Sequence, residues 1–248
     1  MTDTSMKKNR RFRWLWILAA LFLVLTVGVI AYLSDYYHAS KVAFQKLENP
    51  PETVEVLRSD QRIVFSPEHP SAGLIFYPGG KVEFEAYTPL LEACAENGIL
   101  CVLPHMPGNL AVLDENAADG IAEEYPEIHS WYLAGHSLGG TIAAIYAEKH
   151  PNDYSGLILL ASYSTKNLSE SGLKVLSMYG SEDGVMNREN YAKNWAMLPS
   201  DAREIVIDGG CHAYFGSYGE QAGDGAPKIS QREQQRQTVS EIVKLIEP

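Results

Sequence analysis

The stretch Trp131-Tyr-Leu-Ala-Gly-His-Ser-Leu-Gly-Gly140 decides the fold of this chain. Its apolar start, residues 131–134, predicts a strand, and residues 140–150, which precede Pro151, predict a helix. The pattern G-x-S-x-G fills the turn between them. Gly135 and Gly139 lack the Cβ atoms that would hold strand and helix apart. We therefore predict that Ser137 projects from a sharp strand-to-helix turn.

A serine at such a turn is a candidate nucleophile. The backbone N–H of the next residue, Leu138, points to where an oxyanion would form, and the start of the helix adds partial positive charge there. A five-residue pattern of this kind also occurs by chance. The predicted strand before it and helix after it favour the nucleophile over the chance match.

Composition excludes several classes of protein. The chain has 248 residues, of which 46% are hydrophobic, so it can bury a substantial core. Its formal net charge is −11, which opposes binding to phosphate backbones, and we expect no nucleic-acid partner. The three cysteines, Cys94, Cys101 and Cys211, form no CxxC pair, which argues against a zinc site or a disulfide framework, although one disulfide stays possible. We expect neither a metal nor an organic cofactor.

The N-terminal region predicts a membrane anchor. Residues 1–13 are polar and basic, and Trp14 to Leu33 is a run of twenty residues without a charge. A helix of that length spans about 30 Å, the thickness of a bilayer core. A cleaved signal peptide is the alternative, but its apolar core is usually about 7–15 residues, and no good cleavage site follows. The basic flank predicts a cytoplasmic N-terminus, and hence a single-pass cell-membrane protein whose body lies on the extracytoplasmic side.

After this anchor the chain alternates between strands and helices. Residues 34–51 are expected to form a stalk or linker that ends at Pro50-Pro51, and residues 52–248 a single domain. Strands are predicted over 53–58, 61–66, 73–77, 99–103, 131–134, 157–160, 173–179 and 204–207, and helices over 84–97, 116–125, 140–150, 188–198 and 230–246. This order is typical of an α/β fold with a doubly wound, mostly parallel sheet. The short stretch 161–172 leaves room only for a minimal lid.

Three polar residues follow three of these strands. They are Ser137, Asp183 and His212, and the ends of parallel strands share one edge of a sheet. A serine needs a base to take its proton, and a histidine titrates in the right range. A carboxylate can hold the imidazole in the useful tautomer. Asp208 is the alternative carboxylate. His136 is expected to point away from Ser137, because adjacent turn residues diverge.

These motifs resemble the α/β-hydrolase superfamily, whose order of Ser, Asp and His they share. The stretch His212-Ala-Tyr-Phe-Gly-Ser-Tyr-Gly219 and the loop Gly223-Asp-Gly225 resemble a small bacterial branch related to dienelactone hydrolases and carboxylesterases. The wider resemblance to the superfamily covers residues 53–248. Its motifs are Tyr77-Pro-Gly-Gly-Lys81, Gly135-His-Ser-Leu-Gly139, Gly180-Ser-Glu-Asp-Gly184 and Gly210-Cys-His-Ala213. It implies Ser137 as nucleophile, Asp183 as acid and His212 as base. It also implies a second oxyanion donor from the loop after the third strand, at Gly80 or Lys81, besides Leu138.

The expected function is therefore that of a membrane-anchored serine hydrolase. It would cleave an ester or related acyl bond in a small-molecule or lipid-like substrate through an acyl-enzyme. Two alternatives stay open. The same three residues would serve an acyltransferase, and the same fold without turnover would serve as an anchored binding module.

Overall fold

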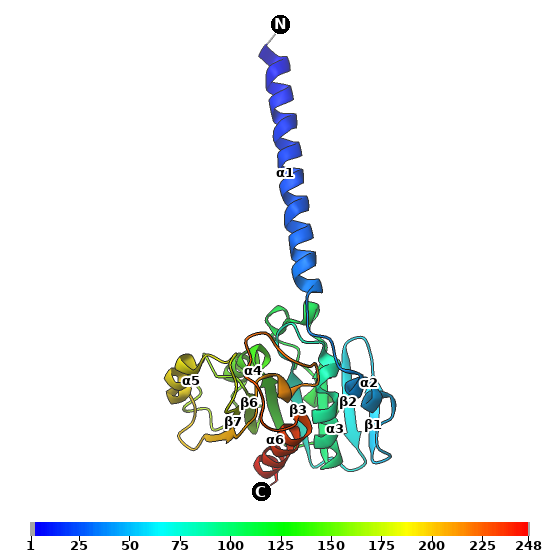
Figure 1. The fold of residues 1–248 in the computed structure, drawn as a ribbon, viewed down its shortest axis with the longest axis vertical. Helices are drawn as coiled ribbons and strands as arrows, with labels where there is room; N and C mark the ends of the chain where they lie inside the picture. The colour runs from blue at the N-terminus through cyan, green and yellow to red at the C-terminus, as the bar shows by residue number, and fades with distance from the viewer. Residues whose placement is uncertain (1–2, 248) are drawn as a thin grey trace. The chain divides into compact units, whose positions relative to one another are not determined.

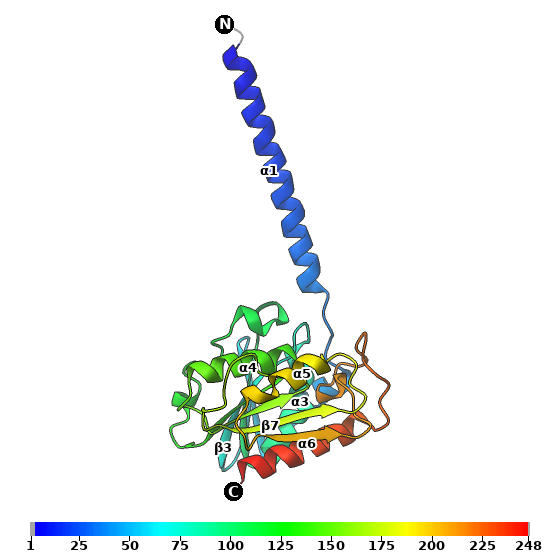
Figure 2. The same ribbon diagram turned by 90° about the vertical axis from the view of Figure 1, so that its left-hand side faces the viewer.

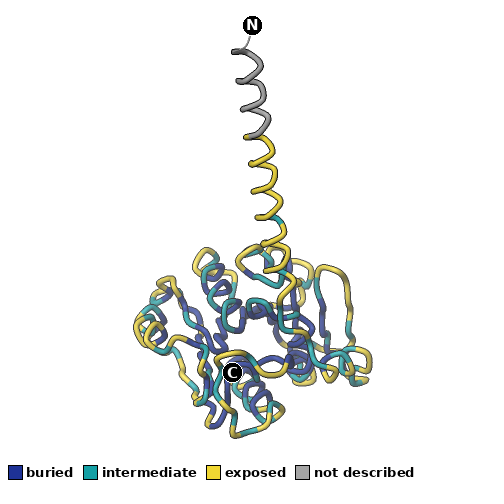
Figure 3. Tube along the Cα trace, turned by 45° about the horizontal axis from the view of Figure 1, so that its top comes forward, coloured by how far each residue is buried: buried dark blue, intermediate teal, exposed yellow. Residues whose placement is uncertain are grey.

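The computed structural model describes the backbone of residues 3–247, and the side chains from residue 14 onward. The chain forms two compact units, Met1–Tyr36 and Tyr37–Pro248. The first unit is a single helix, α1 (Asp3–Ser34). Its segment Trp14–Ser34 has a mean hydropathy of 2.5 and none of it is buried, as Figure 3 shows. One helix of this length and composition fits a membrane anchor or a signal sequence. The side chains of the basic segment 1–13 lie outside the described residues.

The second unit contains an eight-stranded sheet in the order β1-β2-β4-β3-β5-β6-β7-β8 (Figure 1). Strands β1 and β2 run antiparallel to their neighbours, and the pairs from β4 through to β8 are parallel. The strands are β1 (Val54–Arg58), β2 (Arg62–Pro67), β3 (Ala72–Tyr77), β4 (Ile99–Pro104), β5 (Trp131–His136), β6 (Gly156–Leu160), β7 (Lys174–Gly180) and β8 (Arg203–Ile207). Because β3, β4 and β5 are buried at every position, they read as apolar runs rather than as alternating patterns.

Helices cover both faces of this sheet, so the predicted α/β class and doubly wound architecture are confirmed. The helices are α2 (Lys41–Glu48), α3 (Thr88–Glu96), α4 (Leu138–Lys149), α5 (Arg188–Asn194) and α6 (Gln231–Ile246). One core contains Leu90 of α3 and Ile242 of α6, and the other contains Ala143 of α4. Figure 2 shows α4 and α6 on opposite sides of the strands.

Three predicted helices differ from the structure. The prediction of a helix over 116–125 was wrong, because only the 3-10 turn Ala122–Glu124 forms in that segment. Gly120 has a φ of 74°, which an α-helix does not accommodate, and the chain turns at that point. The helix expected over 84–97 begins as the 3-10 turn Phe84–Tyr87, and the one over 188–198 ends as the 3-10 turn Trp195–Met197.

The segment 34–51 differs from a free stalk. From Tyr37 onward it belongs to the second unit. Tyr37 forms a parallel bridge to Val82, Ser40 donates its N–H to the carbonyl of Ser217, and Ala43 of α2 is fully buried. The connection between β6 and β7, residues 161–173, contains neither a helix nor a strand, in agreement with the minimal lid.

Candidate active site

Ser137 occupies a strained turn between β5 and α4. Its φ of 53° and ψ of −122° are unusual for a residue other than glycine, so packing around it must offset the strain. That packing leaves no room for side chains. A Cβ on Gly139 would lie 2.2 Å from the carbonyl oxygen of Tyr77, and one on Gly135 would lie 2.5 Å from the nitrogen of Gly140. Strand, turn and helix therefore hold Ser137 at the end of the sheet.

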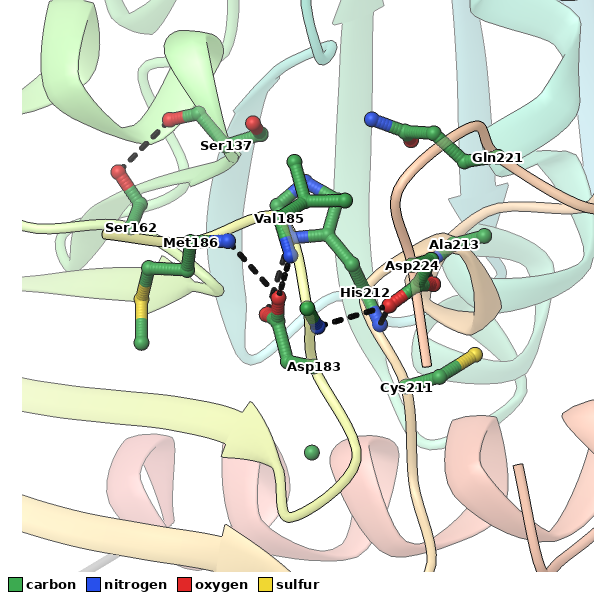
Figure 4. A network of polar contacts seen from close by, with 12 residues as sticks. Ser137, Ser162, Asp183, Val185, Met186, Cys211, His212, Ala213, Gln221 and Asp224 are labelled. Atoms are coloured by element: carbon green, nitrogen blue, oxygen red, sulfur yellow. Dashed lines mark hydrogen bonds and ion pairs between the residues drawn. The ribbon is translucent and has the colours of Figure 1, made fainter. Parts of the chain in front are cut away.

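The backbone of Ser137 is fixed on both sides. Its N–H donates to the carbonyl of Leu160 over 2.9 Å, which ties the turn to the end of β6. Its carbonyl accepts the hydroxyl of Ser162 over 2.7 Å, as Figure 4 shows. Both contacts use the backbone, so they orient the residue without occupying its side chain.

Asp183 and His212 form a buried pair. Nδ1 of His212 lies 2.9 Å from Oδ2 of Asp183, and both side chains are at most 1% exposed. The other carboxylate oxygen accepts the backbone N–H groups of Val185 and Met186 over 2.9 and 2.8 Å. Burial alone would raise the pKa of Asp183, but the hydrogen bond and charge of His212 and these two amides outweigh it and lower that pKa. Asp183 is thus an anion that accepts a proton-bearing Nδ1.

This tautomer leaves the far nitrogen of His212 available. A carboxylate only accepts, so Nδ1 donates, and in the neutral ring Nε2 carries a lone pair. Nε2 is buried and has no hydrogen-bond partner among the described residues. Figure 4 shows Ser137 on the side of the ring that faces away from Asp183. A buried acceptor without a partner, on a ring that a carboxylate orients, suits the role of a general base.

The candidate oxyanion donors can be separated by their hydrogen bonds. In residues 78–81, here called the oxyanion loop, the N–H of Lys81 already donates to the carbonyl of Asn109 over 2.7 Å. The N–H groups of Gly80 and Leu138 have no acceptor among the described residues. A Cβ on Gly80 would lie 2.8 Å from Cδ2 of Leu138, so these two residues adjoin. Of the two alternatives, Gly80 rather than Lys81 has a free N–H beside Leu138.

The other candidates lie elsewhere. Asp208 is exposed and makes no hydrogen bond to His212. Burial raises the pKa of the Cys211 thiol to about 12, so it stays protonated. Cys94, Cys101 and Cys211 are all free thiols. Within the described residues, no cluster of three or more His, Cys, Asp or Glu side chains is placed to hold a metal ion.

Two residues that the sequence analysis did not single out hold the base loop, residues 210–213. Asp224 lies in a stretch that reads as a surface loop, yet its Oδ1 accepts the N–H groups of Gly184 and His212, and its Oδ2 that of Ala213. It therefore joins the turn that carries Asp183 to the loop that carries His212 (Figure 4). An aspartate between two glycines was the available signal, but the same pattern is common in turns.

Gln234 of α6 is the second such residue. Its side-chain oxygen accepts the N–H of Cys211 over 2.9 Å, and its side-chain nitrogen donates to the carbonyl of Cys211 over 2.8 Å. The amide thus pairs with the backbone as a neighbouring strand would. Nothing in the sequence marks Gln234 among the other glutamines of its helix.

Comparison with known proteins gives one family and many similar folds. The sequence profile of the alpha/beta hydrolase family matches residues 73–236. No curated protein sequence matches this chain. A monoacylglycerol lipase from Paleococcus ferrophilus is 16% identical with a TM-score of 0.58, over 77% of this chain and 99% of its own. Est1E from Butyrivibrio proteoclasticus is 12% identical with a TM-score of 0.57, over 79% of this chain and 100% of its own. A putative lipase from Acinetobacter baumannii AYE is 14% identical with a TM-score of 0.54, over 82% of this chain and 95% of its own.

Proposed function

Because this chain belongs to the alpha/beta hydrolase family, we propose that it is a serine hydrolase that cleaves an ester or a related acyl bond. Ser137 is the nucleophile, His212 the general base and Asp183 the carboxylate that orients His212. One observation carries the proposal. The buried Asp183–His212 pair leaves Nε2 without a partner, on the side of the ring where Figure 4 draws the strained Ser137.

The proposed reaction begins when Nε2 of His212 takes the proton of the Ser137 hydroxyl as its oxygen attacks the carbonyl carbon. The N–H groups of Leu138 and Gly80 stabilise the negative charge on the carbonyl oxygen, with help from the start of α4. His212 then returns the proton to the leaving alcohol, and the acyl group stays on Ser137. A water molecule, activated by the same Nε2, releases the acid and restores the serine.

We further propose that α1 anchors the enzyme in the cell membrane, with the body on the extracytoplasmic side. The apolar segment Trp14–Ser34 and the five basic residues before it support this topology. The substrate is a small or lipid-like acyl compound. One of the structural neighbours is named a monoacylglycerol lipase, so the length of the acyl chain is the substrate property to measure.

The test is a series of p-nitrophenyl esters of increasing acyl length, hydrolysed by the full chain in detergent. Ser137→Ala and His212→Gln should each lower kcat by about 10⁴-fold or more. Ser164→Ala and Asp208→Asn are the matched controls, because Ser164 is a buried serine bonded to the carbonyl of Lys166 and Asp208 is exposed. Unchanged turnover in Ser137→Ala would refute the proposal.

Product analysis separates hydrolysis from acyl transfer on the same residues. A hydrolase yields free acid in the presence of alcohols or amines, whereas an acyltransferase yields mainly the new ester or amide. If no ester is turned over and His212→Ala leaves the biological role intact, the chain is a binding module with the same fold.

A further inference from the structure

A buried histidine that the proposed reaction does not use contacts the proposed base. His136 precedes Ser137, is 1% exposed and contacts the rings of Tyr87, His212 and Phe215. Its ring centroid is 4.6 Å from that of His212. His136 was expected to point away from Ser137, and its ring nitrogens instead bond to the base loop at His212 and to the hydroxyl of Tyr87.

The hydrogen bonds of His136 have only one consistent set of directions. Nε2 lies 3.1 Å from the carbonyl oxygen of His212, and a carbonyl only accepts, so Nε2 carries the proton. In the neutral ring Nδ1 then accepts, and its partner, 2.8 Å away, is the hydroxyl of Tyr87. The oxygen of Tyr87 in turn accepts the N–H of Gly79 over 2.9 Å.

The protonation state of His136 supports these directions. Burial, followed by the nearby charge of His212, holds the pKa of His136 well below its usual value, so the ring is neutral. Burial likewise raises the pKa of Tyr87, which keeps its hydroxyl proton. A neutral His136 does not repel the imidazolium that His212 becomes during the proposed reaction. The aromatic residues Phe215 and Tyr218 complete its surroundings.

The resulting chain of bonds crosses the whole site. It runs from Gly79, next to the free N–H of Gly80, through Tyr87 and His136, to the backbone of His212. The loop that would bind the oxyanion and the loop that carries the base are thereby joined through the residue before the nucleophile. The close packing around Gly79 also shows that Tyr87 and His136 lie against the oxyanion loop. A Cβ at that position would lie 2.7 Å from the hydroxyl of Tyr87 and 2.8 Å from Nδ1 of His136.

We propose that His136, together with Tyr87, is a positioning residue that sets the spacing between the Gly80 N–H and the His212 ring around Ser137. This inference rests on the proposed function and adds two residues to it. Neither side chain touches the reacting atoms. They act by holding two loops at a fixed separation.

The first experiment removes one hydroxyl. Tyr87→Phe should lower kcat about tenfold with little change in KM, and should weaken binding of a boronic-acid transition-state analogue by a similar factor. Tyr77→Phe is the matched control. Tyr77 is also fully buried, and its hydroxyl also accepts one N–H, from Ala118, and donates to one carbonyl, that of Glu115. Because the two hydroxyls are equally buried and bonded, both variants should lose similar stability. Tyr77 belongs to the core on the α4 side of the sheet and not to the bond chain, so only Tyr87→Phe should lose affinity for the analogue.

The second experiment separates the two bonds of His136. An asparagine places an oxygen near the position of Nδ1, so His136→Asn keeps an acceptor for Tyr87 and loses the donor to His212. A glutamine reaches the position of Nε2, so His136→Gln keeps that donor and loses the contact with Tyr87. Each of these variants breaks one bond of the chain, so adding Tyr87→Phe should lower kcat by a smaller factor in either of them than in the wild-type chain.

The outcomes distinguish this inference from the proposed function. If Ser137→Ala is inactive while Tyr87→Phe binds the analogue as well as Tyr77→Phe does, the positioning role is wrong and the serine mechanism stands. If Tyr87→Phe lowers kcat by the same factor in the wild-type chain and in both His136 variants, no bond chain links the two loops. If Ser137→Ala is fully active, the proposed function itself has failed.

Discussion

The nucleophile and the base of this site are held in place by different means. Ser137 is fixed by close packing, because the glycines around it allow β5, the turn and α4 to touch, and its backbone is strained at a φ of 53°. His212 is fixed by hydrogen bonds. Its side chain is bonded to Asp183, its N–H to Asp224, and its carbonyl lies 3.1 Å from His136.

Ser137 and His212 differ in how far away in sequence the residues that fix them lie. The glycines that shape the serine turn are within three residues of Ser137. The residues that hold the base loop come from the turn after β7, from the loop at Asp224 and from α6 at Gln234. Close packing by neighbouring glycines can be recognised in a short sequence motif. A loop held by hydrogen bonds depends on residues from other parts of the fold. We therefore expect substitutions in the serine turn to lower the free energy of unfolding more than substitutions around the base loop do.

The largest effect is expected on the nucleophile side. Gly139→Ala would place a methyl group 2.2 Å from a backbone carbonyl oxygen, which cannot rotate away, so β3 and α4 must separate. We expect a loss of about 4 kcal/mol or more in the free energy of unfolding, measured by urea denaturation, with no soluble activity. Gly28→Ala, where a Cβ would meet nothing within 4 Å, is the control and should leave the unfolding of the body unchanged. A folded, active Gly139→Ala would show that the turn is not sterically held.

A smaller loss is expected where α6 holds the base loop. Gln234→Leu leaves the N–H and the carbonyl of Cys211 without partners in a buried site, at a cost of about 2–4 kcal/mol in unfolding free energy. The adjacent Gln235 is also buried but bonds only to the hydroxyl of Ser217. Gln235→Leu should therefore be milder, and should lower kcat less. Equal kcat values for the two variants would break the proposed link between α6 and the base.

Asp224→Asn tests the bond between the acid and base turns. An asparagine keeps one acceptor oxygen but loses the charge and the acceptor for Ala213, which we expect to cost about 1–3 kcal/mol and to lower kcat about tenfold. The exposed neighbour Glu220 offers a matched charge control in Glu220→Gln. If both variants retain full kcat in steady-state assays, Asp224 shapes only the surface loop.

The smallest expected effect is on the pH dependence of stability. The pKa of His136 is lowered in the folded state, so between that value and about 6.5 the unfolded chain binds one more proton than the folded one. Stability therefore falls with falling pH below about 6.5, by up to about 1.4 kcal/mol per pH unit from this group. His136→Asn should lose this component of the slope in denaturation curves at several pH values, whereas Tyr87→Phe should keep it. An unchanged slope in His136→Asn would mean that the ring is not held neutral.

The same contrast explains how much the sequence could predict. Ser137, Asp183 and His212 each follow a strand, so the alternation of strands and helices was enough to place them at one edge of the sheet. The choice between Gly80 and Lys81 needed the structure, because it depends on a bond from Lys81 to the carbonyl of Asn109. Gln234 lies 23 residues from Cys211 and Tyr87 lies 8 residues from Gly79. No local sequence pattern marks either of them, or Asp224, as a residue that holds a loop.

Local backbone geometry limited the prediction of helices in a similar way. The apolar pattern of residues 116–125 fits a helix, but the chain turns at Gly120 with a positive φ. Segment 34–51 is polar enough to read as a linker, and it takes the structure to show the contacts with α3, Val82 and Ser217 by which residues from Tyr37 onward join the body.

Covalent labelling shows whether Ser137 is a nucleophile that His212 activates. The full chain in detergent is treated with a fluorophosphonate, and the adduct is located by peptide mass spectrometry. We expect one adduct, on Ser137, that disappears in Ser137→Ala and forms far more slowly in His212→Gln. Labelling that persists in Ser137→Ala, or a wild-type chain that never reacts, would contradict this mechanism.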